Sequence, residues 1–563
     1  MSKEQGSESA VSRSQFIKEE EMAREEEAPK SVSRRGFVKR AALGAGALAG
    51  VGALASCAAP PGEGGPQGPA GPAGPAGPAG PSGITEIEWD YETDVVVAGS
   101  GNGGMSAAIA AAKEGAKVIV VEISSTTGGG SSYSGGYIHA SGLETVAAYL
   151  EKTQGLHDPE LGPFYFENFQ EYKKWLVDLG ADVSPRPGNP VDLVMGKGHT
   201  GERGTQTHCR VYFDSLEKIF KEAGGTFLLK TRARKLLTDE QGTIVGLRAK
   251  GPEGTLNIKG KAVILACGGF QNNPELKQRY LGPEADLSSV CGVPYNEGDG
   301  LVMAQEVGAS LSGGMSTFSA GMGSAHPCRN PQANAEEYEA AGYDFDGKNR
   351  FGALAIPASP STKILVNLDG KRYVDERAGY PRDVNMTTRQ PKATGIAVFD
   401  GAMWDTVKDI ATWHGHTGQD GLQLAVEYGG IVVTADTISE LADKMAELLT
   451  PVHRANFLKT IDEYNKAVEA GTTAELEVAR TASAVKIETS PFYAFFLTPW
   501  IYACFGGLRI NKNAQVLDTQ QEAIPGLYAC PPTAGGVMRS IYTGMIGCAG
   551  TFGWIAGQHA AAL

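Results

Sequence analysis

The sequence predicts an α/β fold with more than one domain. A chain of 563 residues is too long for one ordinary hydrophobic core, so two domains and further appendages are expected. Apolar runs at 95–98 and 117–121 indicate buried strands, and the small residues at 105–114 indicate a helix between them. From about 311 to 491 this pattern changes to a Gly/Ser/Pro-rich stretch and then to amphipathic helices, which marks a second structural region.

A glycine-rich turn with GxGxxG spacing joins the first strand to the helix. Its glycines are Gly99, Gly101 and Gly104, and Glu122 stands at the end of the second strand. Such glycines let the backbone approach a pyrophosphate at the helix N-terminus, and the carboxylate can accept two hydrogen bonds from a ribose diol. Because the chain has 75 glycines, the spacing alone is weak evidence. With strands, helix and acid in register, it predicts a Rossmann-type dinucleotide site rather than a turn without ligand.

Composition excludes several other classes of protein. Hydrophobic residues at 42% and charged residues at 20% are typical of a soluble globular chain, and a net charge of −14 argues against a nucleic-acid partner. The eight cysteines are scattered without CxxC or CxxCH, which favours neither a zinc ribbon, a covalent haem nor a disulfide framework. His414 and His416 are read as surface histidines, so no metal site is predicted.

The N-terminal segment 1–57 predicts export. Its first 30 residues are polar and glutamate-rich, which is typical of disorder. Arg34-Arg35 then lies in a match to the twin-arginine export signal, and the mildly apolar run 41–56 is short for a membrane span. The run stops at Cys57 in a context that resembles a lipoprotein signal. Lipidation of Cys57, with membrane association through that lipid, and ordinary signal cleavage are both open. Either places the protein in the cell envelope, outside the cytoplasm.

A Gly/Pro linker at 58–87 follows, with a collagen-like repeat at 65–83. Six triplets are few for a stable triple helix. An extended spacer with a reach of roughly 60 Å is the plain interpretation; a trimerising stalk is the alternative.

The export signal bears on the choice of dinucleotide. The twin-arginine route carries folded proteins, so a cofactor must be loaded before export and retained by the fold. A soluble nicotinamide cofactor would be separated from its supply, which favours FAD. The glycines and hydroxyls at 124–136 can follow a ribityl chain and reach a flavin ring.

At these residues the chain resembles the FAD-dependent family that groups fumarate reductase and succinate dehydrogenase flavoproteins with 3-ketosteroid dehydrogenases. Similar blocks follow in order at 231–247, 262–270, 296–300, 505–510, 524–529 and 544–557. The resemblance implies a Rossmann-type FAD-binding domain with an inserted α+β cap domain. The implied FAD-binding residues are Gly99, Gly101, Asn102, Gly103, Gly104, Glu122, Thr127, Gly128, Gly129, Ser134, Gly135, Gly136, Ala233, Gly268, Asp299, Met545 and Ile546.

The resemblance also divides the chain. It implies an FAD-binding domain in two parts, 88–310 and 491–563, around a cap at 311–490. The helix at 544–557 should point its N-terminus at the pyrimidine edge of the flavin, where it stabilises negative charge. No His-Thr-Gly-Gly attachment motif is present, so non-covalent FAD is expected. Pro532 stands where the family has a glutamate that contacts FAD, which puts cofactor affinity or redox tuning in question.

The cap holds the expected catalytic groups. Residues 370–383 resemble a fumarate reductase element whose arginine delivers a proton to the substrate, and ketosteroid dehydrogenases carry a tyrosine at the corresponding spacing. This chain has Tyr380 at the ungapped position and Arg382 two residues later. Reduction of an activated alkene needs a proton donor held in place, which either residue can be. The plain alternative for Arg382 is a structural ion pair with Asp383 or Glu376.

The substrate-binding residues match fumarate reductases only in part. His326 resembles a histidine that touches a substrate carboxylate, whereas the second family histidine and the Asn-Arg-Leu-Gly-Gly element are absent. Arg539 and Tyr542 stand in place of that element. Arg539 can bind a carboxylate, and Tyr542 resembles a phenol that polarises a ketone in steroid dehydrogenases. Fumarate itself is therefore disfavoured against a larger, aromatic or monoanionic enoate or enone.

These features favour an exported FAD-dependent reductase of activated C=C bonds, fumarate reductase-like and acting in anaerobic respiration. With no haem motif or second flavin domain visible, electrons must come from a separate cytochrome or quinone-linked protein. The alternative is a 3-ketosteroid-type dehydrogenase. A non-catalytic surface protein with a degenerate flavin fold is the remaining interpretation.

Overall fold

The computed structural model describes residues 87–196, 207–290, 292–324, 363–377, 381–409, 417–427 and 430–563. The described residues belong to one compact unit, Thr85–Leu563. Several predicted features lie outside the described residues: the twin-arginine motif, Cys57, the collagen-like repeat, His326, Tyr380, His414 and His416.

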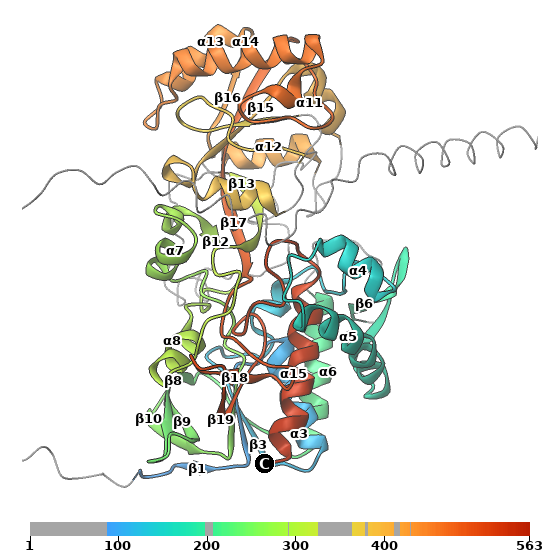
Figure 1. Ribbon diagram of the computed structural model, residues 1–563, viewed down its shortest axis with the longest axis vertical. Coiled ribbons are helices and arrows are strands. Elements are labelled where there is room, and N and C mark those ends of the chain that lie inside the picture. Colours follow the sequence, from blue (N-terminus) through green and yellow to red (C-terminus); the bar gives the residue numbers. More distant parts are fainter. Residues whose placement is uncertain are drawn as a thin grey trace, which may run out of the picture. The chain divides into compact units, whose positions relative to one another are not determined.

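A six-stranded sheet forms the centre of the fold (Figure 1), and most of its strands are parallel. Its order is β18 (Gln515–Leu517), β19 (Ala523–Ala529), β11 (Ala262–Leu265), β2 (Val95–Ala98), β3 (Val118–Val121) and β7 (Thr226–Leu228). Only β18 runs antiparallel to its neighbour. β2, β3 and β11 are buried on both faces, which explains why they read as continuous apolar runs. The predicted α/β class is confirmed.

Two helices of small residues cross this domain side by side (Figure 1): α3 (Asn102–Lys113) and α15 (Met545–Ala561). A Cβ on Gly553 would lie 2.0 Å from the Gly103 carbonyl oxygen, so glycine is required for this approach. α3 begins at Asn102, earlier than the predicted 105, because Gly103 and Gly104 are themselves part of the helix. The predicted C-terminal helix is confirmed, and α15 extends it to Ala561.

The remaining elements of this domain surround the sheet. Its other helices are α4 (Val146–Thr153), α5 (Leu161–Asp178), α6 (Thr207–Glu222), α7 (Pro274–Tyr280) and α8 (Asp299–Glu306). A four-stranded sheet has the order β1 (Tyr91–Glu92), β10 (Gly254–Lys259), β9 (Ile244–Gly251) and β8 (Arg232–Thr238). A three-stranded sheet has the order β4 (Tyr137–Ile138), β6 (Asn189–Met195) and β5 (Val183–Arg186).

A second hydrophobic core lies between Ile364 and Leu497. Its sheet contains β12 (Ser289–Val290), β17 (Phe492–Cys504), β15 (Gly395–Phe399) and β14 (Ile364–Val366), and β13 (Phe318–Ser324) and β16 (Val432–Ala435) also pair with β17. Its helices are α10 (Arg382–Thr387), α11 (Gly401–Val407), α12 (Gly418–Glu427), α13 (Ile438–Ala446) and α14 (Arg454–Ala470). β17 contributes its first half to this core and its last residues to the first core.

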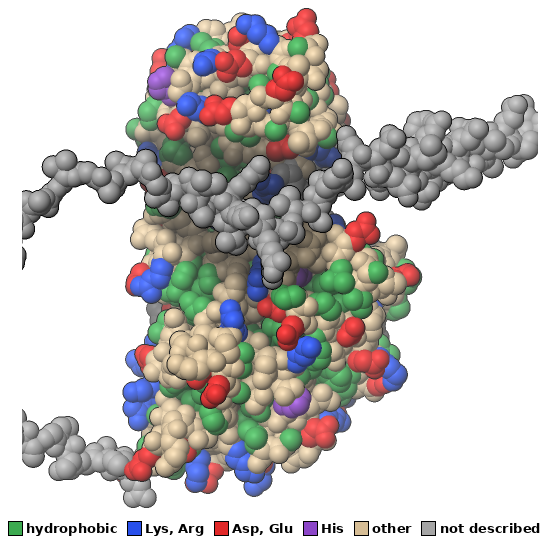
Figure 2. Space-filling view, in the orientation of Figure 1, with side chains coloured by type: hydrophobic (Ala, Val, Ile, Leu, Met, Phe, Trp, Pro, Cys, Tyr) green, Lys and Arg blue, Asp and Glu red, His purple; other side chains and the backbone are tan. Residues whose placement is uncertain are grey.

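The surface carries charges of both signs. On the face in Figure 2, Lys and Arg side chains are interspersed with Asp and Glu rather than gathered by sign. No helix among the described residues has both the length and the apolar character needed to cross a bilayer.

Candidate functional site

A cavity of about 620 Å³ opens at the carboxyl ends of β2, β3 and β11, where a doubly wound sheet binds its ligand. Of the residues predicted from sequence, those that line it are Gly99, Gly101, Glu122, Thr127, Gly129, Ala233, Gly268 and Asp299. The block 231–247 contains the hairpin of β8 and β9, and the block 296–300 leads into α8 and brings Asp299 to the same wall. Five segments far apart in the chain therefore meet at one cavity.

The glycines of the turn differ in the space that a side chain would find. A Cβ on Gly99, whose φ is +107°, would lie 2.3 Å from the Ala266 carbonyl oxygen, and one on Gly104 would lie 2.0 Å from the Gly99 carbonyl oxygen. At Gly101 the nearest atom would be Ser131 Oγ at 3.6 Å. Gly99 and Gly104 thus shape the turn, while Gly101 presents bare backbone to the cavity.

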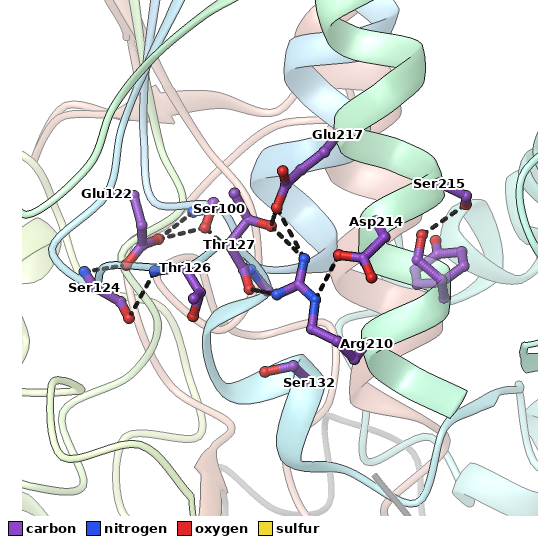
Figure 3. Close-up of polar contacts among 12 residues, drawn as sticks. Ser100, Glu122, Ser124, Thr126, Thr127, Ser132, Arg210, Asp214, Ser215 and Glu217 are labelled. Atoms are coloured by element: carbon purple, nitrogen blue, oxygen red, sulfur yellow. Dashed lines mark hydrogen bonds and ion pairs between the residues drawn. The ribbon is translucent and has the colours of Figure 1, made fainter. Parts of the chain in front are cut away.

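Glu122 is buried at the end of β3 and is already hydrogen-bonded (Figure 3). Its Oε2 accepts from the Ser100 backbone N–H at 2.8 Å and the Ser100 hydroxyl at 2.5 Å, and its Oε1 accepts from the Ser124 N–H at 2.8 Å. Burial raises the pKa of this carboxyl, against these hydrogen bonds. The rotatable Ser100 hydroxyl is the donor that a ribose hydroxyl can replace. The arrangement fits a nucleotide ribose.

Asp299 faces the cavity with its charge compensated. Its carboxylate receives two hydrogen bonds from Arg232, Nε at 2.7 Å and Nη2 at 2.8 Å, and Arg232 also contacts Glu297. This bidentate pair fixes the Asp299 carboxylate at the cavity wall and compensates its charge. Sequence analysis did not identify Arg232.

Asn102, which was predicted to contact the cofactor, is not among the residues that line the cavity. Its Nδ2 donates to the Tyr172 hydroxyl at 3.0 Å and the Ile546 carbonyl at 2.9 Å, and its Oδ1 accepts from the Tyr212 hydroxyl at 2.8 Å. The buried side chain thereby joins α3 to α5, α6 and α15. A cofactor contact by this residue stays a prediction.

The other predicted residues outside the cavity lining surround these elements. Gly103 packs against α15 and Cys530, and Gly128 follows Thr127 in the loop that lines the cavity after β3. Ser134 Oγ donates to the Ser131 carbonyl at 2.8 Å and accepts from the Gly136 N–H at 3.1 Å, which orders the turn through Gly135. Met545 and Ile546 open α15.

The start of α15 meets a second group of polar and aromatic residues. A Cβ on Gly544, whose φ is +112°, would lie 1.9 Å from the His139 carbonyl oxygen. The Tyr542 ring contacts the rings of His139, with centroids 5.9 Å apart, and Phe505, 6.3 Å apart with an interplanar angle of 21°. Burial raises the pKa of Tyr542, against a hydrogen bond with the Met545 backbone, so the phenol stays protonated.

Arg539 lies on the same loop and is paired. Its Nη2 donates to Asp158 Oδ2 at 3.1 Å, and its buried Nε has no hydrogen-bond partner in the described part of the chain. The Thr317 hydroxyl donates to the Arg539 carbonyl. We call His139, Asp158, Phe505, Arg539 and Tyr542 the α15-side cluster.

Arg382 begins α10 and is exposed. Among the described residues no carboxylate lies within ion-pair distance of it, because Glu376 instead binds Arg372 and Arg480, and Asp383 accepts from the Val384 N–H. α10 is attached to β13 through Asn385, which exchanges two hydrogen bonds with Phe318, next to Thr317. These contacts link the Arg382 helix to the strand that adjoins the α15-side cluster.

Comparison with known proteins identifies this arrangement. The sequence profile of a family described as "FAD binding domain" matches residues 94–552. The chain belongs to this family. Its cofactor is FAD, and the cavity described above has the glycine turn and the ribose acceptor of a dinucleotide site.

Three similar proteins place the chain within the family. It is 29% identical to an NADH:acrylate oxidoreductase of Vibrio harveyi over 69% of this chain and 35% of that protein. It is 30% identical to a urocanate reductase of Eggerthella lenta over 72% of this chain and 62% of that protein. The open conformation of a flavocytochrome c3 fumarate reductase matches at a TM-score of 0.59 and 26% identity, covering 84% of this chain and 79% of that chain. The chain thus spans one to two thirds of these two sequence relatives.

His157, which sequence analysis missed, supports the loop that carries Tyr542. Its Nε2–H donates to the Ile541 carbonyl at 3.1 Å, so its Nδ1 accepts from the Tyr149 hydroxyl at 2.6 Å. Burial lowers its pKa to about 4, and the charge of Arg539 acts in the same direction. The native protein therefore holds this imidazole neutral.

This pKa predicts a pH dependence of stability. The unfolded chain binds the His157 proton near pH 6.5 and the folded chain only near 4, so the stability due to neutral His157 is lost as pH falls between these values. The loss is about 3 kcal/mol at most. Urea unfolding at pH 7, 6 and 5 should show a flatter dependence in His157→Gln. Exposed His453 is the control, and an equally flat profile in His453→Gln would contradict the assignment.

Proposed function

We propose that this chain is an exported, FAD-dependent oxidoreductase that reduces an activated C=C bond in an enoate or enone. The observation that carries the proposal is the α15-side cluster, with a protonated phenol and a single paired arginine beside the helix expected to meet the flavin. Relatives named for acrylate and urocanate reduction support the reaction class.

The reaction needs one hydride and one proton. Bound FAD supplies hydride chemistry at its N5 position. The chain supplies the proton and the substrate contacts: Arg382 or Tyr380 of the cap as donor, with Tyr542 as a hydrogen-bond donor to a carbonyl. We keep His326 as a further substrate contact on its sequence context alone.

The charges of the α15-side cluster bear on the substrate. Arg539 contributes one positive charge and Asp158 one negative charge. Burial, with the charge of Arg186 acting in the same direction, lowers the pKa of His139 to about 4, so His139 adds no charge at neutral pH. A cluster with no net charge suits a neutral enone or a monoanionic enoate better than a dicarboxylate, which would leave a carboxylate unpaired.

The proposal includes the expectations about organisation and location. The FAD-binding domain would comprise 88–310 and 491–563 around a cap at 311–490, and FAD would be held without a covalent bond. Export by the twin-arginine route, with Cys57 as a lipid anchor, would place the enzyme at the cell envelope. There a separate cytochrome or quinone-linked protein would supply electrons in anaerobic respiration.

A 3-ketosteroid-type dehydrogenase is the second candidate, because a buried phenol such as Tyr542 can also polarise a ketone. Anaerobic assay with reduced methyl viologen and a panel of enoates and enones, beside steroids with an electron acceptor, separates the two. Turnover of a steroid with acceptor and of nothing else would reject the reductase.

Removal of Arg382 tests the proton donor. We expect Arg382→Ala to lower kcat about 100-fold or more, since positioned proton transfer contributes that much. Exposed Arg389, at the other end of the α10 region, provides the matched control Arg389→Ala. Tyr380→Phe should be measured separately. Near-normal kcat in Arg382→Ala would remove the arginine from this role and leave Tyr380 as the candidate.

A further inference from the structure

The first turns of α6 contact the FAD-binding turn and loop. The Tyr212 hydroxyl reaches Asn102 at the start of α3. A Cβ on Gly128 would lie 3.0 Å from the Phe213 ring, so glycine is required where the loop crosses α6. The loop at 124–130, called here the lining loop, is therefore packed between α6 and the cavity that it lines.

A charged pair on α6 binds this loop at Thr127 (Figure 3). Arg210 donates to the Thr127 carbonyl from Nη1 at 2.7 Å and to Thr127 Oγ1 from Nη2 at 3.2 Å. The same Nη2 lies 2.8 Å from Glu217 Oε1, and the Thr127 hydroxyl donates to that oxygen at 2.5 Å. Thr127, Arg210 and Glu217 thus form a closed triangle, called here the latch.

The side chains of the latch are partly shielded from solvent, which strengthens the ion pair between Arg210 and Glu217. Arg210 is 34% exposed and Glu217 24%, whereas Asp214, which binds Arg210 Nε at 2.7 Å away from the loop, is 61% exposed. Partial burial alone would raise the pKa of Glu217, but the Thr127 hydrogen bond and the Arg210 charge hold it below its ordinary value. Hydrogen bonds to charged groups are about twice as strong as neutral ones.

Other hydrogen bonds of the lining loop go to Ser100 and Glu122. The Gly128 N–H contacts the Ser100 carbonyl at 3.1 Å and the Ser100 hydroxyl at 3.2 Å, and Ser124 donates to Glu122. Ser100 and Glu122 are themselves cavity residues, so bound nucleotide competes for these groups. Within the latch, Thr127 lines the cavity, whereas Arg210 and Glu217 hold it from α6 and are not cavity residues.

We infer that Arg210 and Glu217 are positioning residues that hold the lining loop against bound FAD and set the rate at which FAD leaves. Neither side chain lines the cavity, so neither is a direct ligand. The inference concerns retention of the cofactor and needs no substrate, so its failure is distinct from failure of the proposed activity.

The test measures FAD release from the loaded protein. After large dilution into FAD-free buffer, the rise of flavin fluorescence gives the release rate. We expect Glu217→Gln and Arg210→Gln to release FAD about tenfold to a hundredfold faster, from the loss of charge-assisted hydrogen bonds. Arg210→Lys should fall between, because an ammonium cannot reproduce the planar fork.

Asp214→Asn is the matched control, since it alters the same guanidinium away from the loop. Thermal unfolding of apoprotein and loaded protein provides the second readout: the latch variants should lose much of the FAD-induced rise in Tm while the apoprotein Tm stays near that of Asp214→Asn. Glu217→Gln is nearly isosteric, so it keeps the test available if Arg210→Gln does not fold. Release at the rate of Asp214→Asn, or an equal fall of Tm in both forms, would overturn the inference.

Discussion

Gly104→Ala is expected to yield a protein that retains no FAD. The new Cβ would lie 2.0 Å from the Gly99 carbonyl oxygen and 3.2 Å from the Ala266 side chain, and the nearer neighbour is backbone that cannot rotate away. α3 must then move from β2, at a cost of about 3 kcal/mol. Because the same turn presents Gly101 to the cavity, the cofactor site is lost with it.

FAD content after purification and urea unfolding of the apoprotein measure both effects. Gly115→Ala is the control: it follows α3 with a φ of +92° but has open space around it, so it carries only the left-handed backbone penalty of about 1 kcal/mol. Full FAD content in Gly104→Ala would show that the turn can adapt.

Glu376→Gln is expected to unfold the second core first. The Glu376 carboxylate accepts from Arg372 Nη2 at 2.6 Å and Arg480 Nη1 at 2.8 Å, and from the Leu365 N–H at 2.9 Å. The Glu376 side chain is fully buried, and those of Arg372 and Arg480 are at most 5% exposed. Removing the carboxylate charge takes a shared counter-ion from two buried guanidinium groups, at a cost of about 3–5 kcal/mol.

Denaturant unfolding followed by tryptophan fluorescence tests this, since Trp404 lies in the second core. The control is Glu463→Gln in α14, whose pair with Lys459 is 55–70% exposed and should contribute little. Equal stabilities of the two variants would show that the buried triad is replaceable.

The triad also bears on the cap element predicted from sequence. The stretch 370–383 was singled out for catalysis, yet Arg372 and Glu376 within it are bound to each other, and Glu376 is also bound to Arg480, more than a hundred positions away. Sequence spacing could not separate a residue that forms a buried ion pair from one that is exposed, such as Arg382, because the partner comes from a distant segment.

Other residues escaped sequence analysis for the same reason. Arg210, Arg232 and His157 each act through hydrogen bonds to residues of other segments. An arginine on an amphipathic helix resembles any solvated arginine until the loop that it contacts is in place. Pro532, which stands where the family has a glutamate, is not among the residues that line the cavity.

The sequence by itself determined the parts of this protein that depend on local geometry. The GxGxxG turn, the buried strands and Glu122 follow from the needs of adjacent residues and predicted a dinucleotide-binding α/β fold. The export signal and the family resemblance, which also gave the C-terminal helix, pointed to FAD. Only the tertiary structure decided that Asn102 joins helices, that Arg539 is paired with Asp158, and that α6 supports the lining loop. Hydrogen bonds and ion pairs between distant segments depend on where the fold brings side chains together, which local patterns do not encode.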